Sequence, residues 1–338
     1  MKTALVLGGG GIVGMAYHAG ALKALADAGA RPEAADVLVG TSAGSVMSAY
    51  LAAGWTAGDF YDYAHGRHPS AAGDEGAERD EVRRLFTPLA HTRGERVRRS
   101  IGSMFAAVSA RTGLPARVVG GVPPALLRRA FPAGMYSTEE TRDRLRSELP
   151  RQWPERDVFV CAADLYTGAR VAFGAPGAPD VSFPDAVLAS CAIPGVFPPV
   201  SLAGRFYVDG GVVSATSLDL AVEAGCDAIV CIAPLGYRHE DGVTLRDPKL
   251  WGPVLVRTPW ARALRREVRA ARARGVEVLV VRPWISDLVA HGTNSMRQLD
   301  RRALSDGARR GTARLLEAYR DHPALEALRA PSYEGRTG

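Results

Sequence analysis

The chain has 338 residues and a formal net charge of +6, with 47% apolar and 23% charged residues. These proportions are typical of a soluble globular protein with a sizeable core, and they exclude a low-complexity chain. The four cysteines form no Cys-x-x-Cys pair and no histidine cluster accompanies them, so we expect neither a zinc site nor a disulfide framework.

The apolar segments do not predict export or membrane insertion. The N-terminal apolar run is interrupted by four glycines, from Gly8 to Gly11, too early for a signal peptide. The longest apolar stretch, residues 186–203, contains three prolines and cannot form a simple spanning helix. We therefore expect a cytoplasmic protein.

The first elements in the chain predict a βαβ unit. Residues 3–7 form a short apolar run, glycines follow, and residues 15–28 place apolar side chains at helical spacing. A second β-branched run at residues 37–39 completes the pattern, which is typical of a parallel sheet.

The glycine loop between the first strand and helix allows three interpretations. The spacing Gly9-x-Gly11-x-x-Gly14 matches a dinucleotide fingerprint, but the acid that this fingerprint needs at the end of the second strand is missing. The loop amides could instead form an oxyanion hole, because the ends of adjacent parallel strands lie at one sheet edge. A tight turn is the purely structural alternative.

The second strand runs directly into Gly40-Thr41-Ser42-Ala43-Gly44 and an Ala-rich helical segment. Strand, Gly-x-Ser-x-Gly and helix together are the pattern of a nucleophile elbow, in which Ser42 stands on a sharp turn at a helix N-terminus. Ser42 is therefore the candidate nucleophile.

Two segments are strongly positive, and the rest of the chain is slightly acidic. Residues 91–131 contain eight arginines and one acid, and residues 257–274 contain seven arginines and one acid. In the first of them, Val97, Ile101, Met104, Phe105 and Val108 recur at helical spacing. This predicts an amphipathic helix, either a membrane-surface element or lid, or a solvated face packed on its own protein. Nucleic acid is not expected as a partner, because no recognition motif accompanies the charge.

The remaining elements follow from apolar periodicity and turn residues. Further helices are expected at residues 55–63, 139–149, 183–190, 218–224, 260–274 and 299–319, and further strands at 157–164, 170–173, 205–208, 228–233 and 277–281. Residues 66–80 are expected to form a loop, and the chain after about residue 323 is expected to be peripheral. Cys161 and Cys231 lie in strand-like runs, which predicts buried reduced thiols.

A serine nucleophile needs a proton acceptor, and two residues could supply one. In chain order His291 is the candidate for a Ser-acid-His triad. Asp209 is the other candidate, because it follows a buried strand and precedes Gly210 and Gly211, which leave its carboxylate accessible. An ordinary Asp-Gly turn is the structural alternative.

Four motifs in this order resemble the patatin-like phospholipase family: GGGIVG at residues 9–14, GTSAG at 40–44, ASCAIPGVFPPV at 189–200 and DGG at 209–211. The resemblance extends over most of residues 3–320, but residues 66–135 match no motif of the family. We therefore expect one domain over residues 1–325, with a basic, partly helical insertion at 66–135 and a peripheral tail at 326–338.

The resemblance implies a three-layer α/β/α fold with a central, mostly parallel sheet. It further implies a dyad without histidine, in which Ser42 is the nucleophile and Asp209 is the base, and it implies no metal or cofactor. The oxyanion hole would be formed by the amides of Gly9, Gly10 and Gly11. The motif residues that support the site are Gly14, Gly40, Gly44, Pro194, Gly210 and Gly211.

The implied activity is hydrolysis of acyl esters of lipids. The arginine-rich segments suggest peripheral contact with anionic membranes. The chain departs from the family at Val13, where an arginine or lysine is usual, so a charge near the oxyanion or a phosphate is lost. The alternative function is a non-catalytic lipid or membrane-surface binding protein with a decayed site.

Overall fold

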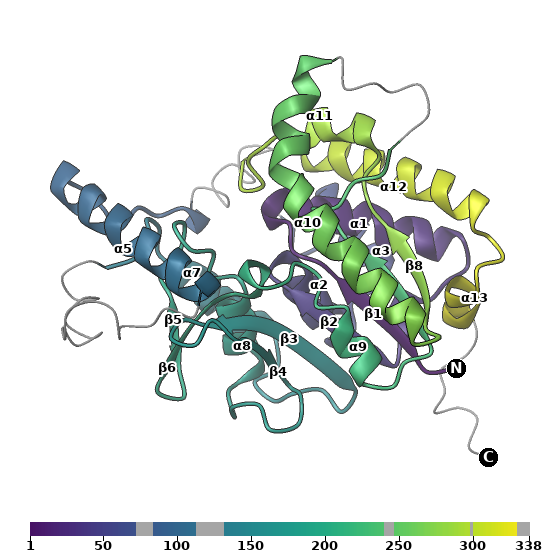
Figure 1. Cartoon of the computed structure of the whole chain (residues 1–338), viewed down its shortest axis with the longest axis horizontal. Helices are drawn as coiled ribbons and strands as arrows, with labels where there is room; N and C mark the ends of the chain where they lie inside the picture. Colours follow the sequence, from purple (N-terminus) through teal and green to yellow (C-terminus); the bar gives the residue numbers. More distant parts are fainter. Residues whose placement is uncertain (72–83, 113–131, 240–246, 298–299, 330–338) are drawn as a thin grey trace. The chain divides into compact units, whose positions relative to one another are not determined.

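The computed structural model describes residues 1–71, 84–112, 132–239, 247–297 and 300–329 (Figure 1). The chain divides into two compact units. The first comprises Met1–Gly73, Pro154–Phe159 and Ser214–Gly338, and the second comprises Asp74–Trp153 and Val160–Val213. Parts of the predicted loop at 66–80 and of the predicted insertion at 66–135 lie outside the described residues, and the single-domain boundary stays a prediction.

The first unit is built on a parallel sheet in the order β2-β1-β7-β8. Its strands are β1 (Thr3–Leu7), β2 (Val37–Thr41), β7 (Ala228–Ile232) and β8 (Glu277–Val281). The first three are buried along their whole length, as expected for β-branched runs covered on both faces. Leu7 pairs with both Gly40 and Ile232, so β1, β2 and β7 end at one edge, where the residues after β1 and β2 meet.

Helices cover both faces of this sheet, as the predicted three-layer architecture requires (Figure 1). One face carries α1 (Gly11–Asp27), α2 (Ala43–Ala52), α3 (Ala57–Ala64) and α12 (Arg301–Ala318). The other carries α9 (Asp219–Glu223) and α10 (Pro248–Ala273). The short elements η1 (Pro32–Ala34), η3 (Ile285–Asp287) and α11 (Leu288–His291) connect them.

Helices α1 and α12 pack closely, because α1 has a glycine where they meet. A Cβ placed on Gly20 would lie 2.0 Å from the carbonyl oxygen of Ser305 and 2.8 Å from the amide nitrogen of Arg309. No side chain fits in that space, so glycine at this point allows the two helices to approach.

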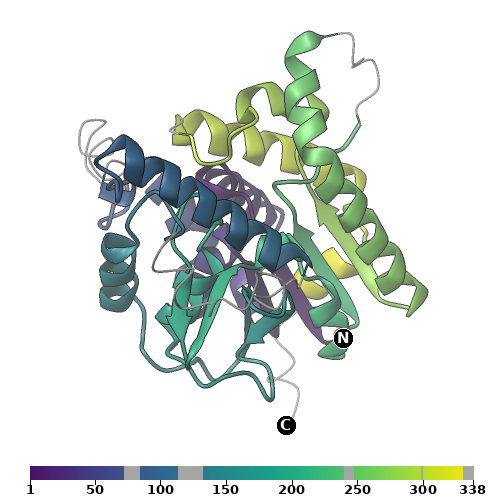
Figure 2. The same cartoon turned by 60° about the vertical axis from the view of Figure 1, so that its left-hand side comes forward.

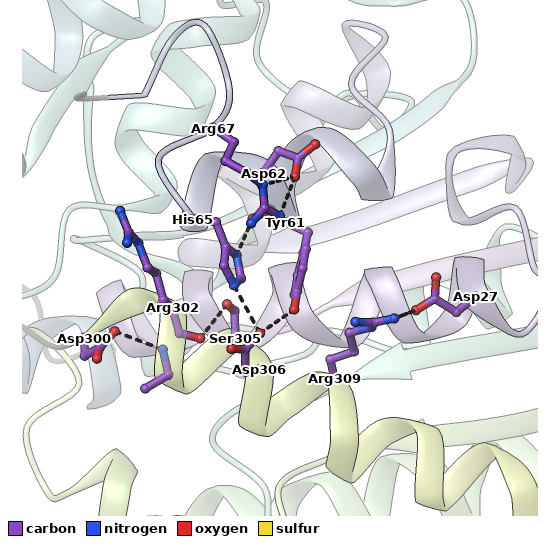
Figure 3. A network of polar contacts seen from close by, with 11 residues as sticks. Asp27, Tyr61, Asp62, His65, Arg67, Asp300, Arg302, Ser305, Asp306 and Arg309 are labelled. Atoms are coloured by element: carbon purple, nitrogen blue, oxygen red, sulfur yellow. Dashed lines mark hydrogen bonds and ion pairs between the residues drawn. The ribbon is translucent and has the colours of Figure 1, made fainter. Parts of the chain in front are cut away.

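A polar network ties α12 to α1 and α3 (Figure 3). The Tyr61 hydroxyl donates to the Asp306 carboxylate, and His65 Nε2 lies 3.1 Å from the same oxygen. The hydrogen bond from Tyr61 lowers the pKa of Asp306. Beside it, Arg309 Nε donates to Asp27 at 2.7 Å, and its guanidinium lies over the Tyr61 ring. The network fixes the helical layer that lies behind the glycine loop.

The second unit pairs its strands antiparallel, in the order β5-β6-β3-β4. Its strands are β4 (Arg170–Phe173), β5 (Val200–Leu202), β6 (Arg205–Asp209) and most of β3 (Asp157–Asp164), which starts in the first unit. Its helical elements are α5 (Arg93–Thr112), α7 (Glu139–Glu148), α8 (Phe183–Ser190) and η2 (Gly210–Val212).

The α/β class with a central, mostly parallel sheet is confirmed, and two predictions about helices are wrong. Helix α10 begins at Pro248, not at residue 260, although prolines 253 and 259 lie inside it. The segment from Pro323 to Arg329 was expected to be peripheral, but it forms the helix α13 (Pro323–Arg329). Leu325 and Leu328 of this short helix are buried, and α13 packs against β1, β7 and β8.

Candidate active site

Ser42 connects β2 to α2 through a strained turn. Its backbone has φ 54° and ψ −123°, a conformation that side chains with a Cβ rarely adopt, and its side chain is buried. It is the N-cap residue of α2, so the helix N-terminus and its dipole lie at this residue. This is the strand, sharp turn and helix expected of a nucleophile elbow.

The two glycines around Ser42 make the turn possible. A Cβ on Gly40 would lie 2.6 Å from the Cα of Ser45, and a Cβ on Gly44 would lie 1.8 Å from the carbonyl oxygen of Leu7. Ser45 Oγ donates to the carbonyl oxygen of Ser42 at 2.7 Å. Close backbone packing therefore holds the first turn of α2 against the end of β1.

The structure brings the glycine loop next to Ser42. A Cβ placed on Gly9 would lie 3.4 Å from the Cβ of Ser42. The Gly8 amide donates to Ile232 at 2.9 Å and the Gly9 amide donates to Ala215 at 2.8 Å. Among the residues that the structure describes, the amides of Gly10 and Gly11 have no acceptor. Two N–H groups thus remain available at the end of the loop whose residue Gly9 lies beside Ser42.

His18 holds the loop from the side of α1. Its Nε2 donates to the Gly8 carbonyl oxygen at 2.7 Å, and its ring is fully buried. Burial lowers the pKa of His18 to about 4, so the imidazole is neutral at neutral pH. The role of His18 could not be predicted from the sequence, because a histidine on an apolar helix face gives no sign of a contact with a carbonyl outside that face.

A carboxylate on α10 fixes the turn that receives the Gly9 amide. Glu267 accepts hydrogen bonds from Ser214 Oγ at 2.6 Å and from the Thr216 hydroxyl. Ala215, whose carbonyl accepts from Gly9, lies between these two residues. In the sequence Glu267 stands out only as the single acid of a basic segment, since its hydrogen-bond partners lie in a different part of the chain.

A second segment covers the N-terminus of α1. The Val13 amide donates to the carbonyl oxygen of Ser295 at 3.1 Å, and a Cβ on Gly11 would lie 2.6 Å from Met296 Sδ. The pyrophosphate of a bound dinucleotide would lie at this helix N-terminus. Because Ser295 and Met296 occupy this place, the glycine loop does not fit a dinucleotide site. The Val13 side chain is buried, which suits an apolar residue better than a charged one.

Asp209 lies in the second unit, at the end of β6. Its amide donates to the carbonyl oxygen of Ala192 at 3.0 Å, and its Oδ1 accepts the Gly211 amide at 2.7 Å. Its side chain is buried. A Cβ on Gly210 would lie 2.4 Å from the carbonyl oxygen of Cys161, and a Cβ on Gly211 would lie 2.9 Å from Asp209 Oδ1. Gly210 is therefore needed to form this turn, and a side chain at position 211 would displace the Asp209 carboxylate.

The motif at residues 189–200 supports Asp209 within the second unit. Its residue Ala192 accepts the Asp209 amide, and Ser190 Oγ donates to the carbonyl oxygen of Cys161 at 2.6 Å. Pro194 lies in the turn closed by the Val196 amide, which donates to Ile193 at 3.0 Å. The structure thus joins the third and fourth motifs, while the pairing of Asp209 with Ser42 stays a prediction.

His291, the triad candidate, is packed in the first unit against Tyr17, with ring centroids 5.7 Å apart. Its Nδ1 is buried and has no hydrogen-bond partner in the part of the chain that the structure describes. Burial, with Arg257 and Arg297 nearby, lowers the pKa of His291 to about 3. An imidazole with such a pKa is a poor general base at neutral pH.

Other reactive groups in the described ranges are few. Cys161, Cys226 and Cys231 are buried reduced thiols, as predicted for the first and last of them, and burial raises the pKa of Cys226 to about 12. No group of three or more His, Cys, Asp or Glu residues in these ranges could hold a metal ion. None of the described helices is both long enough and apolar enough to cross a bilayer.

The family model described as patatin-like phospholipase matches residues 5–222, more than half of the 338 residues. The chain belongs to the patatin-like phospholipase family. Patatin-like proteins are lipid acyl hydrolases as a family, and both Ser42 and Asp209 lie inside the matched residues. Among solved structures, the crystal structure of VipD from Legionella pneumophila is similar with a TM-score of 0.44 and 15% sequence identity. The match covers 94% of this chain and 66% of the VipD chain.

Proposed function

We propose that this patatin-like protein is a serine hydrolase that cleaves carboxylic esters of lipids through a Ser42–Asp209 dyad and an acyl-enzyme. The observation that carries the proposal is the strained turn at Ser42, placed beside a glycine loop in which two N–H groups have no acceptor among the described residues. In this setting the serine hydroxyl can attack a carbonyl carbon, and the neighbouring N–H groups can stabilise the oxyanion that the attack produces.

In the proposed reaction Ser42 Oγ attacks the ester carbonyl carbon and its proton passes to the Asp209 carboxylate. The tetrahedral intermediate then collapses, the C–O bond to the alcohol breaks, and the alcohol leaves with that proton. Asp209 next takes a proton from water, which attacks the acyl-enzyme, and the fatty acid leaves as Ser42 regains its proton.

The contacts of the glycine loop narrow the proposed oxyanion hole. The sequence suggested three donors, but the Gly9 amide already donates to Ala215. We therefore assign the oxyanion to the amides of Gly10 and Gly11, with Gly9 serving as the residue whose lack of a side chain lets the loop approach Ser42.

The substrate is proposed to be a lipid or another hydrophobic ester, with anionic membranes contacted through the arginine-rich segment at residues 91–131. Val13 supplies no charge to the loop, so recognition of a phosphate headgroup cannot depend on this position. We expect neutral esters and phospholipids to be cleaved with a smaller preference for the phosphate than an arginine would give.

The test uses Ser42→Ala and Asp209→Asn with a soluble p-nitrophenyl ester and with a fluorophosphonate probe. Each substitution is expected to lower kcat/KM by about a thousandfold or more. Ser42→Ala removes the oxygen that attacks the ester carbonyl carbon, and Asp209→Asn removes the carboxylate that accepts the proton. Wild-type protein should be labelled by the fluorophosphonate on Ser42.

Ser100→Ala is the matched control, because Ser100 is an exposed serine of α5. It should keep wild-type turnover and labelling. Turnover of the ester by folded Ser42→Ala protein would contradict the proposal. Wild-type protein that bound lipid, took up no fluorophosphonate and released no product would instead support the non-catalytic alternative.

A further inference from the structure

Helix α5 presents its apolar residues to solvent. We call this outward face the α5 stripe; it consists of the exposed residues Val97, Met104, Phe105 and Val108, with Ile101 half-buried between them. Met104 is 62% exposed, Val97 59% and Phe105 44%, although these side chains recur at the spacing that usually marks a buried helix face. An apolar stripe left in water on a helix is a mark of an interaction surface.

The opposite face of α5 packs on the second unit through small residues. Gly102, Ser103 and Ala106 are buried, and Ala106 packs with Ala163 and Val208 of the adjoining strands. Figure 2 shows α5 lying across the strands of this unit. The stripe is therefore outward because the inward face is already occupied, and the helix needs no rearrangement to expose it.

Positive charge flanks the stripe. At 100° per residue, Arg98 lies on one side of it, and Arg93 and Arg96 lie on the other. All three side chains are exposed, and Glu95 is the single acid of the helix. This arrangement matches an anionic membrane surface. The apolar side chains can enter the acyl-chain region, and the arginines on both flanks can contact the lipid phosphates.

We propose that α5 docks this protein on an anionic phospholipid bilayer by inserting the α5 stripe between the headgroups. The docking rests on the proposed function in one respect, since the bilayer is then the source of the ester. Within the second unit α5 contacts η2, the turn that follows Asp209. Docking by this helix therefore places the membrane surface close to the element that carries the proposed base.

The experiment measures binding of Ser42→Ala protein, which leaves the vesicle lipids intact, to two kinds of vesicle. One contains phosphatidylcholine alone and the other also contains phosphatidylglycerol. Binding should be stronger to the anionic vesicles and should weaken as salt rises above about 0.1 M, where the Debye length falls below about 10 Å. Replacing Met104 and Phe105 by serine should lower the partition coefficient on both vesicles by about tenfold or more.

Two further variants separate the contributions. Arg96→Gln with Arg98→Gln should reduce binding to the anionic vesicles and leave binding to phosphatidylcholine unchanged. Leu255→Ser with Val256→Ser removes a matched exposed apolar pair on α10 and should bind like the unaltered protein. Circular dichroism and thermal melting check that each variant is folded.

Three results would overturn the proposal: no vesicle binding, equal binding by the Met104/Phe105 variant, or an equal loss in the α10 variant. A dimer that the Met104/Phe105 variant turns into a monomer would show that a second copy, and not a bilayer, covers the stripe. Wild-type turnover of the soluble ester is measured in parallel. Turnover without vesicle binding removes only the docking proposal, and α5-dependent binding without turnover removes only the proposed function.

Discussion

At the scale of single residues, Ser42 holds an unfavourable conformation that its neighbours enforce. A residue with a Cβ at φ 54° and ψ −123° costs about 1–3 kcal/mol relative to a relaxed backbone. The packing of Gly44 on Leu7 and the hydrogen bond from Ser45 keep the turn closed in spite of this cost. Strain retained at one buried serine is the kind of observation from which a chemical role is inferred.

The backbone strain at Ser42 should make two variants without the hydroxyl differ in stability. Both Ser42→Gly and Ser42→Ala lack the hydroxyl, so they differ only in the Cβ. Glycine adopts this conformation freely, and that gain exceeds the entropy that it adds to the unfolded chain. We expect Ser42→Gly to be more stable than Ser42→Ala by about 1 kcal/mol, measured by urea unfolding.

The same pair of substitutions at Ser100 serves as the control. Ser100 lies in the helix α5 and is exposed. There Gly should be less stable than Ala by about 1 kcal/mol, the usual helix preference. If glycine were the less stable residue at both positions, the turn at Ser42 would carry no strain.

Some residues of the candidate site were predictable from the sequence and others were not. Gly40 and Gly44 stand in a local motif, where the need for glycine follows from the turn itself. His18 and Glu267 act on the glycine loop and its supporting turn through partners far away in the chain. Such contacts depend on how the elements pack, so no spacing in the sequence marks them.

At the scale of elements, the contact between α1 and α12 depends on Gly20. We predict that Gly20→Ala lowers the free energy of unfolding by about 2 kcal/mol or more, because the added methyl group meets the Ser305 carbonyl and the helices must separate. Urea unfolding measures the change. Separation of α12 would also disturb the polar network between Asp306 and Tyr61 (Figure 3).

Gly307 of α12 provides a control on the same pair of helices. A Cβ placed there would meet nothing within 4 Å. Gly307→Ala should therefore raise the free energy of unfolding by about 0.5–1 kcal/mol, through helix preference alone. Equal effects at the two glycines would contradict the close contact at Gly20.

The elements that periodicity predicts best are those buried on both faces. Strand β1 begins at Thr3 and ends at Leu7, where the sequence places it, because a fully buried apolar run followed by glycines has one favourable pairing. Helix α13 was missed since it is short and only a few of its side chains are buried. For α5, periodicity predicted the helix but not which of its faces is buried. That depends on the small residues that pack on the strands of the second unit.

At the scale of the whole molecule, the motifs that resemble the family divide between two compact units. Ser42 and the glycine loop belong to the first, and Asp209 with the motif at residues 189–200 belongs to the second. The sequence ordered these motifs along the chain but could not assign them to units, because that depends on contacts between distant segments. Comparable losses for Ser42→Ala and Asp209→Asn would link the two units in one reaction.

The first unit also buries two histidines that titrate abnormally. Burial lowers the pKa of His18 to about 4, and burial beside Arg257 and Arg297 lowers that of His291 to about 3. In the unfolded chain each imidazole has a pKa of about 6.5. Between these values the unfolded state binds more protons than the folded state, so the free energy of unfolding falls as the pH is lowered.

We predict that stability is full above about pH 6.5 and declines between about pH 6.5 and 4, by up to about 1.4 kcal/mol per pH unit for each histidine. Carboxylates with lowered pKa values, such as Asp306, add their losses only at lower pH. Urea unfolding at several pH values measures the slope. Replacing His291 by glutamine, which does not titrate, should remove one histidine's share of it. An unchanged slope would mean that His291 gains its proton without unfolding, and that its burial does not oppose the charged form.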